Sequence, residues 1–130
     1  MMRRLMRLTA LSVILVVAAA ATARAQQALP DGVTKQMVDD GAKLFSGQGL
    51  CHACHGPQGK GMPGMGANLT DKQWLHSDGS YDGIVKTVMS GVPSDKSSNH
   101  SVMPPKGGSS LNDAQIKAVA AYVWSLSNAK

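Results

Sequence analysis

Apolar residues recur at helical spacing in three segments of this chain. The first runs from about residue 35 to 46, where an apolar or small side chain returns every three or four positions: Met37, Val38, Gly41, Leu44 and Phe45. Thr34 stands before this segment as a candidate N-cap, and Gly47 stands after it as a stop. The pattern predicts an amphipathic helix.

The second helical segment begins near Ser80. Its predicted apolar face contains Ile84, Val85, Val88 and Met89. Gly91 and Pro93 follow shortly afterwards. They should end the helix, because glycine accepts the left-handed C-terminal conformation and proline cannot continue the hydrogen-bond ladder.

The third segment has the strongest helix signals. Asn112 is predicted to cap it, and Gln115 to complete a capping box three residues later. Leu111 and Ile116 would then form a hydrophobic staple across the first turn. The predicted buried face contains Ile116, Val119, Ala120, Tyr122 and Val123.

The segments between these helices have the composition of loops. Residues 47–66 are rich in glycine and include two prolines, and residues 94–110 are polar and irregular. A short helical turn is predicted around Trp74. The sequence contains no alternating strand pattern, so the predicted fold class is all-α, a small helical bundle with long loops.

The first 25 residues are predicted to be a secretory signal peptide. Three arginines precede an apolar run at 8–21, and the segment closes on an Ala-x-Ala pattern that ends at Ala25. The run is short and rich in alanine for a membrane-spanning helix, and an uncleaved anchor is the alternative. Residues 26–33 form a predicted flexible lead-in, and residues 34–130 the folded domain.

The charge distribution supports this division. The whole chain has a formal net charge of +5, but all four arginines lie before residue 26. The remaining nine lysines against eight aspartates leave a net charge of +1. No basic stripe is interleaved with aromatic residues, so nucleic-acid binding is not predicted. An exported protein of this kind is predicted to be periplasmic, touching a membrane only through partners or an uncleaved signal.

The segment Cys51-His52-Ala53-Cys54-His55 carries the candidate chemistry. It matches the C-x-x-C-H pattern of haem attachment. Each thiol adds to a vinyl group of the porphyrin, and the histidine places a ring nitrogen on the iron. A domain of this size buries a modest core, so a haem would also fill its centre. We predict one covalently attached haem c per chain, held by Cys51, Cys54 and His55.

Two other interpretations of the cysteine pair stay open from the residues alone. The thiols could form a redox dithiol, although the βαβ pattern that accompanies such motifs is missing. They could bind zinc together with His55, His76 or His100, although no second cysteine pair completes the usual ligand spacing. A disulfide between residues so close together would constrain the unfolded chain little.

Several stretches together resemble a class I cytochrome c of bacteria, closest to the haem domains that serve terminal oxidases and periplasmic dehydrogenases. They are CHACHG, GKG, GANLT, MPP and the final AYVWSLS, and the resemblance covers residues 34–127. It implies a small helical bundle wrapped around the haem. The first and last helices would cross, with Gly41 and Phe45 against Val119 and Tyr122.

The resemblance also implies a methionine as the sixth ligand of the iron. Met103 is the predicted residue, because Pro104 and Pro105 would stiffen the backbone that presents it. Its competitors are His100, His76 and an open sixth position. The other methionines of the domain are assigned to the glycine-rich loop or to apolar helix faces: Met62, Met65, Met37 and Met89.

The resemblance suggests further roles around the haem. In the family a proline carbonyl accepts a hydrogen bond from the iron-binding histidine, and the GANLT stretch offers Ala67 in its place. Trp74 could reach a haem propionate, with core packing as the alternative. Lys60, Lys72 and Lys106 could line the haem edge, but the net charge of only +1 favours a solvated surface for them.

A histidine–methionine pair on the iron favours electron transfer over substrate chemistry. The predicted function is therefore a periplasmic one-electron carrier, not an enzyme. Its expected partners are a membrane oxidase, a reductase or a dehydrogenase, which it could serve as a free carrier or as a fixed subunit. The alternative is a haem sensor or peroxidase-like enzyme with a labile sixth ligand.

Overall fold

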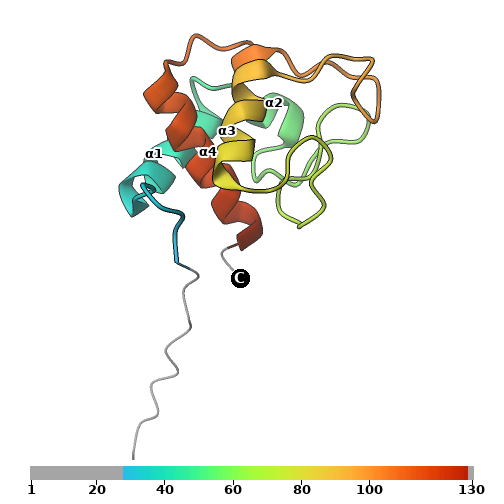
Figure 1. The fold of residues 1–130 in the computed structure, drawn as a ribbon. Coiled ribbons are helices and arrows are strands. Elements are labelled where there is room, and N and C mark those ends of the chain that lie inside the picture. Colours follow the sequence, from blue (N-terminus) through green and yellow to red (C-terminus); the bar gives the residue numbers. More distant parts are fainter. Residues whose placement is uncertain (1–27, 129–130) are drawn as a thin grey trace, which may run out of the picture.

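The computed structural model describes residues 28–128, and its elements in that range are helical (Figure 1). In chain order they are α1 (Lys35–Ser46), α2 (His52–His55), α3 (Tyr81–Ser90), the 3-10 helix η1 (Pro105–Gly108) and α4 (Asp113–Asn128). Extended pairing among the described residues is limited to two isolated bridges, Met62 with Gly66 and Val92 with Met103. For this part of the chain the all-α prediction is confirmed.

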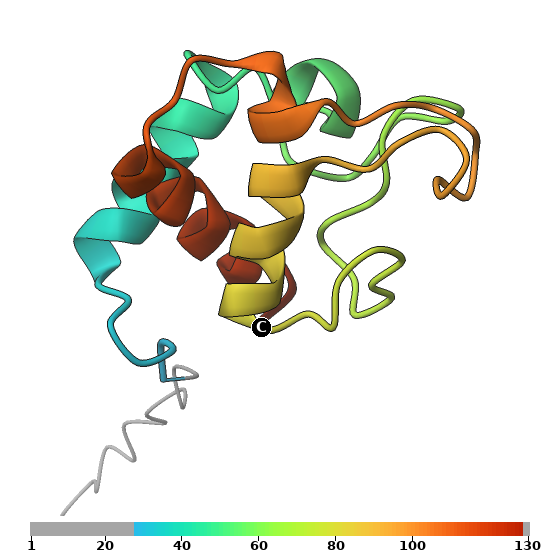
Figure 2. The same cartoon turned by 45° about the horizontal axis from the view of Figure 1, so that its top comes forward.

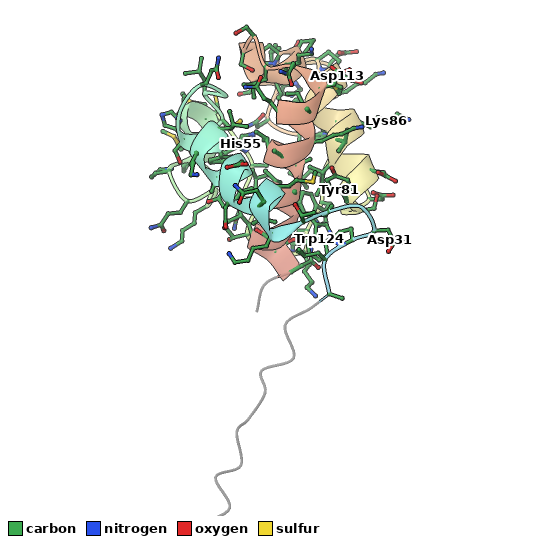
Figure 3. All side chains as sticks on the ribbon, turned by 90° about the vertical axis from the view of Figure 1, so that its left-hand side faces the viewer. Asp31, His55, Tyr81, Lys86, Asp113 and Trp124 are labelled. Carbon is green, nitrogen blue, oxygen red and sulfur yellow. The ribbon has the colours of Figure 1, made fainter. Side chains whose placement is uncertain are left out.

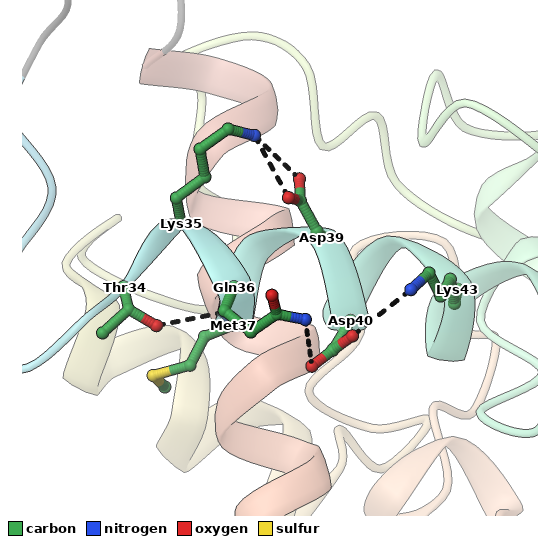
Figure 4. A network of polar contacts seen from close by, with 7 residues as sticks. All are labelled: Thr34, Lys35, Gln36, Met37, Asp39, Asp40 and Lys43. Carbon is green, nitrogen blue, oxygen red and sulfur yellow. Dashed lines mark hydrogen bonds and ion pairs between the residues drawn. The ribbon is translucent and has the colours of Figure 1, made fainter.

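The first helix begins and ends where the sequence predicts. The Thr34 hydroxyl oxygen accepts a hydrogen bond from the Met37 N–H at 3.2 Å, and the Gly47 N–H donates to the Leu44 carbonyl. Exposed side chains one turn apart pair along the outer surface of α1 (Figure 4): Lys35 with Asp39, Gln36 with Asp40, and Lys43 with Asp40. These pairs leave the inner face of the helix free to pack.

α1 and α4 cross at close range, as Figures 1 and 2 show. A Cβ atom at Gly41 would collide with the Ala118 carbonyl and would lie 2.9 Å from the Tyr122 Cβ. The buried ring of Phe45 meets the Tyr122 ring edge-on, with centroids 5.3 Å apart. The predicted crossing is confirmed, and Ala118 is a close neighbour that the sequence did not suggest.

α4 starts with the predicted reciprocal cap. The Gln115 N–H donates to Asn112 Oδ1 at 2.9 Å, and the Asn112 N–H donates to Gln115 Oε1 at 3.0 Å. Leu111 and Ile116, the predicted staple, are both buried. The core of the domain contains Phe45, Ile84, Val88, Leu111, Ile116, Val119, Ala120 and Val123. It is therefore built mainly from α3 and α4, with one large ring from α1.

α3 also matches its prediction. The Ser80 hydroxyl oxygen accepts a hydrogen bond from the Gly83 N–H at 2.9 Å and so caps the helix. Gly91 ends it with φ +69°, a left-handed conformation that glycine adopts without strain. Ile84 and Val88 are buried on the inner face.

The predicted turn of helix around Trp74 is wrong. The backbone of this stretch bends instead through local side-chain contacts, among them Asp71 Oδ1 accepting from the Gln73 N–H at 2.9 Å and the Ser77 hydroxyl accepting from the Gly79 N–H at 3.1 Å. Such contacts satisfy backbone N–H groups without a helical ladder, so they compete with helix formation.

The glycine-rich stretch at 47–66 is not a loop throughout. The cysteine motif winds into α2, where the His55 N–H donates to the Cys51 carbonyl at 3.0 Å. The polar stretch at 94–110 is likewise interrupted, by η1. Both helices are four residues long, which is too short for periodicity to reveal them.

The predicted signal segment at 1–25 lies outside the described residues, and its role stays a prediction. Of the lead-in, residues 28–33 are described, and Val33 is buried with its N–H donating to the Pro30 carbonyl at 3.0 Å. Among the described helices, none has the length and apolar character needed to cross a bilayer.

Candidate functional site

The apolar core opens on one side into a cavity of about 430 Å³. Core residues from three helices form its floor: Phe45, Ile84, Val88, Val119 and Val123. Loop residues of the stretches 60–69 and 97–104 form its walls, and Figure 2 shows these loops extending together beyond α3. The volume lies in the range of sites that enclose a small-molecule cofactor.

α2 places three side chains of the cysteine motif on the cavity: Cys51, Cys54 and His55. The two cysteines are free thiols, and their spacing of three residues puts them on the same face of one helical turn. The Cys51 thiol donates to the Gly49 carbonyl at 3.4 Å. Burial raises the pKa of this thiol above its usual range, so Cys51 is held as the neutral thiol.

His55 is oriented by the residue that the sequence predicts. Its Nδ1 lies 2.8 Å from the Ala67 carbonyl oxygen. Because a carbonyl only accepts, Nδ1 donates this hydrogen bond, which leaves Nε2 as the ring nitrogen that could bind a metal. The residue before Ala67 has no room for a side chain, since a Cβ at Gly66 would collide with the Cys54 carbonyl. Close backbone packing therefore brings Ala67 within reach of the ring.

Met103 lines the same cavity from a different part of the chain. Its backbone forms an isolated bridge with Val92, the Val92 N–H donating to Met103 at 2.8 Å and the Met103 N–H donating to Val92 at 2.9 Å. Gly91 packs against the Met103 carbonyl, where a Cβ would not fit. The structure thus brings two distant parts of the sequence to one cavity. They are the cysteine motif, with Cys51, Cys54 and His55, and the segment that contains Met103.

Of the other side chains considered as the sixth ligand of the iron, some line the cavity and others do not. Met62 and Met65 also line the cavity and are 40% and 49% exposed, a position that their place on a glycine-rich loop did not suggest. The bridge between Met62 and Gly66 brings them there. His76 lines the cavity too, whereas His100 is exposed and outside its lining. Met89 packs against the core as predicted.

The three lysines considered for the haem edge lie in different surroundings. Lys60 lines the cavity and Lys72 is exposed on the surface. Lys106 donates instead to the Leu111 carbonyl at 3.2 Å and pairs with Asp113 at 3.6 Å. This lysine is therefore committed to the start of α4. Figure 3 shows Lys86, the lysine of α3, and His55 on opposite sides of α4 in that view.

Comparison with known proteins decides the family. The model of the family described as "Cytochrome C oxidase, cbb3-type, subunit III" matches residues 36–123. The chain belongs to this family. It is a class I monohaem cytochrome c domain, and the matched range contains both the cysteine motif and Met103.

Three curated relatives illustrate the similarity. The cbb3-type oxidase subunit CcoP of Rubrivivax gelatinosus is 46% identical over 79 residues, covering 60% of this chain and 23% of that subunit. The subunit FixP of Bradyrhizobium sp. is 41% identical over 91 residues, which cover 69% of this chain and 28% of FixP. The subunit CcoP of Rhodobacter capsulatus is 40% identical over 96 residues, which cover 67% of this chain and 30% of that subunit. The chain thus spans roughly a quarter of the length of these relatives.

A solved structure supports the fold. Cytochrome CL from the marine methylotroph Methylophaga aminisulfidivorans superposes with a TM-score of 0.53, at 22% identity, over 70% of this chain and 53% of that one. At this identity the likeness concerns the arrangement of the helices alone.

Membership of the cytochrome c family implies a covalently bound haem c, and the described residues fit that group. Two free thiols lie one helical turn apart, at the N-cap of α2 and within it, the Nδ1 of His55 is bonded to the Ala67 carbonyl, and apolar core residues line the cavity beside them. Among residues 28–128 no cluster of three or more His, Cys, Asp or Glu side chains gathers at metal-binding distance. The family match favours haem over the zinc and dithiol alternatives.

Proposed function

We propose that this protein is a periplasmic carrier of single electrons that uses a histidine- and methionine-ligated haem c. The observation that carries the proposal is the cavity itself. The cysteine motif lines it from α2, and Met103 lines it from a separate segment. One apolar site therefore offers two attachment points and two candidate ligands of the iron.

Each residue has a distinct role in this proposal. Cys51 and Cys54 would hold the porphyrin through thioether bonds. His55 would bind the iron through Nε2, while the Ala67 carbonyl fixes its ring and increases its basicity. Met103 would fill the sixth position with a neutral sulfur, which raises the reduction potential relative to a second histidine. When bound, the haem accepts and releases one electron without any bond being made in a substrate.

The proposed partner is a membrane oxidase. The curated relatives are named as subunits of cbb3-type cytochrome c oxidases, and this chain matches only part of their length. We propose that the domain passes electrons to such an oxidase from a reductase or dehydrogenase, outside the cytoplasm. Residues 1–25 would direct export, because their basic start, apolar run and Ala-x-Ala ending are those of a signal peptide.

A redox titration of the exported protein, followed by visible spectroscopy, tests this function. We expect covalent haem in a pyridine haemochrome assay, the long-wavelength charge-transfer band of methionine–iron(III) ligation, and a reversible one-electron titration. Met103→Ala should abolish that band and lower the potential, whereas Met65→Ala should keep both. Protein of bare polypeptide mass from its own host would refute the proposal.

A second candidate function, a haem sensor or peroxidase-like enzyme, is favoured by one feature. Met62 and Met65 line the same cavity as Met103, so they could compete with Met103 for the sixth position and make that ligand labile. A ferric protein that lacks the methionine band and reduces peroxide in its resting state would support this alternative over electron transfer.

A further inference from the structure

Two loop segments contribute neighbouring parts of the cavity lining. The first, residues 61–66, is here called the glycine turn. The Gly61 N–H donates to the His55 carbonyl at 2.8 Å, and the turn is closed by the Met62 N–H donating to Gly66 at 2.9 Å. Through these bonds the glycine turn is fixed to α2, the helix that carries the cysteine motif.

The second segment, residues 93–103, is here called the Met103 segment. At its end, Met103 is paired with Val92 through two backbone hydrogen bonds. The described hydrogen bonds of residues 94–100 stay within the segment, as where Ser97 donates to Asn99 Oδ1 at 2.8 Å. The part of the segment before Met103 is therefore organised by itself rather than by the helices.

One side chain joins the two segments. The Ser101 hydroxyl donates to the Gly64 carbonyl oxygen at 2.7 Å, across 37 positions of sequence. Gly64 lies in the middle of the glycine turn, where it is exposed and has φ +71°, a left-handed conformation that glycine adopts without strain. Ser101 is half-buried and stands two residues before Met103. Both segments line the cavity.

We propose that Ser101 is a positioning residue that latches the Met103 segment to the glycine turn. This inference rests on the proposed function, since it takes Met103 as the sixth ligand. Val92 holds the backbone of Met103 itself, and the latch holds the chain two residues earlier against the glycine turn, which is fixed to α2. Release of the latch lets the segment swing away more often, so that outside ligands reach the iron faster.

Imidazole binding to the ferric, haem-loaded protein tests the latch. The test compares the wild type with Ser101→Ala and with Ser101→Thr, which keeps the hydroxyl. Ser97→Ala is the matched control, because it removes a hydrogen bond that stays inside the same segment. We expect Ser101→Ala to bind imidazole about three- to ten-fold faster, the range that one net hydrogen bond supports. Ser101→Thr and Ser97→Ala should stay near the wild-type rate.

Amide hydrogen exchange gives a second readout that does not depend on ligand binding. In Ser101→Ala, exchange should rise in residues 93–103 and in the glycine turn while α1 and α4 keep their protection. A general loss of stability would instead raise exchange in the helices too.

The outcomes separate the latch from the proposed function. A wild-type protein without the methionine band refutes Met103 ligation and the latch together. A wild type that has the band, with Ser101→Ala binding imidazole at the wild-type rate, refutes the latch alone. Equal acceleration in Ser97→Ala also refutes it, because the effect would then belong to the loop as a whole.

Discussion

The crossing of α1 and α4 and the walls of the cavity are held together in different ways. At the crossing, backbone approaches backbone at Gly41, and the ring of Phe45 is fully enclosed. In the walls, loop segments are held by hydrogen bonds rather than by packed apolar volume, among them Ala67 with His55 of α2 and Gly64 with Ser101. The crossing therefore carries the stability of the domain, while the walls determine what the cavity presents to a cofactor.

This contrast separates two kinds of substitution. A change at the crossing removes or overfills packed apolar volume, which costs free energy of unfolding. A change in a wall alters the position of one group at the cavity, which should affect the spectrum and ligand binding more than stability. The predictions below test this separation.

The largest effect is expected for Phe45→Ala. The ring is fully buried and packs against Tyr122, and its removal leaves a cavity. We expect a loss of about 3–5 kcal/mol in the free energy of unfolding, measured by urea titration of the haem-loaded protein. Phe45→Leu should lose less, since it keeps most of the volume. If Phe45→Ala is as stable as the wild type, the crossing is not the centre of stability.

A smaller loss is expected for Gly41→Ala. The new methyl group would collide with the Ala118 carbonyl, so α1 and α4 must move apart. Overpacking of this kind costs about 1–3 kcal/mol, although alanine favours the helix by up to about 1 kcal/mol. Thermal unfolding followed by circular dichroism measures the balance. The control is Ala114→Gly, at an exposed site of α4, which measures the difference in helix propensity between alanine and glycine without a change in packing. If Gly41→Ala is more stable than the wild type, the two helices do not cross as closely as described.

The matched wall substitution is Gly66→Ala. Its methyl group would meet the Cys54 carbonyl and would push Ala67 away from His55. We expect a stability loss of about 1–2 kcal/mol together with a raised reduction potential, because a weaker hydrogen bond makes the imidazole less basic. Potentiometry and urea titration on the same sample compare the two effects. If Gly66→Ala loses stability but keeps the wild-type reduction potential, substitutions in the wall and at the crossing do not differ in the way proposed.

The smallest effect is expected at the cap of α3. The Ser80 hydroxyl and Ser80 N–H donate to the Asp78 carboxylate and hold the pKa of Asp78 below its ordinary value of 3.8. Because the folded pKa is lowered, the contribution to stability is present above pH 3.8 and disappears as the pH falls through the folded pKa. In Asp78→Asn the stability should therefore fall less steeply as the pH is lowered, which thermal unfolding between about pH 2 and 6 measures. Asp95→Asn, the same substitution at an exposed position outside this cap, is the control.

The sequence predicted the longer helices α1, α3 and α4 well, because each of them has its own local signals. Thr34 and Asn112 are caps that residue type and position alone make recognisable, Ser80 marks the predicted start of α3, and the apolar periodicity identified the buried faces. The acceptor role of Ala67 was also predicted, through the resemblance to cytochromes c, and the hydrogen bond confirms it. Haem ligation by His55 and Met103 stays a prediction that the chemistry of the cavity supports.

The loop walls could not be predicted in the same way. The place of Met62 and Met65 at the cavity depends on a bridge between residues of an aperiodic loop. The contact of Ser101 with Gly64 joins positions 37 residues apart, and Lys106 turns toward Leu111 because α4 begins there. Such contacts follow from the packing of whole segments, which neither propensity nor spacing encodes.

The pairing of the first and last helices has a consequence for how this unit combines with others. Both ends of the described chain leave the bundle on the same side, low in Figure 1, while the cavity loops extend elsewhere. A tether, an anchor or another domain could thus be fused at either end without covering the redox centre. Such modular construction suits the named relatives, in which the region similar to this chain makes up 23–30% of a longer polypeptide.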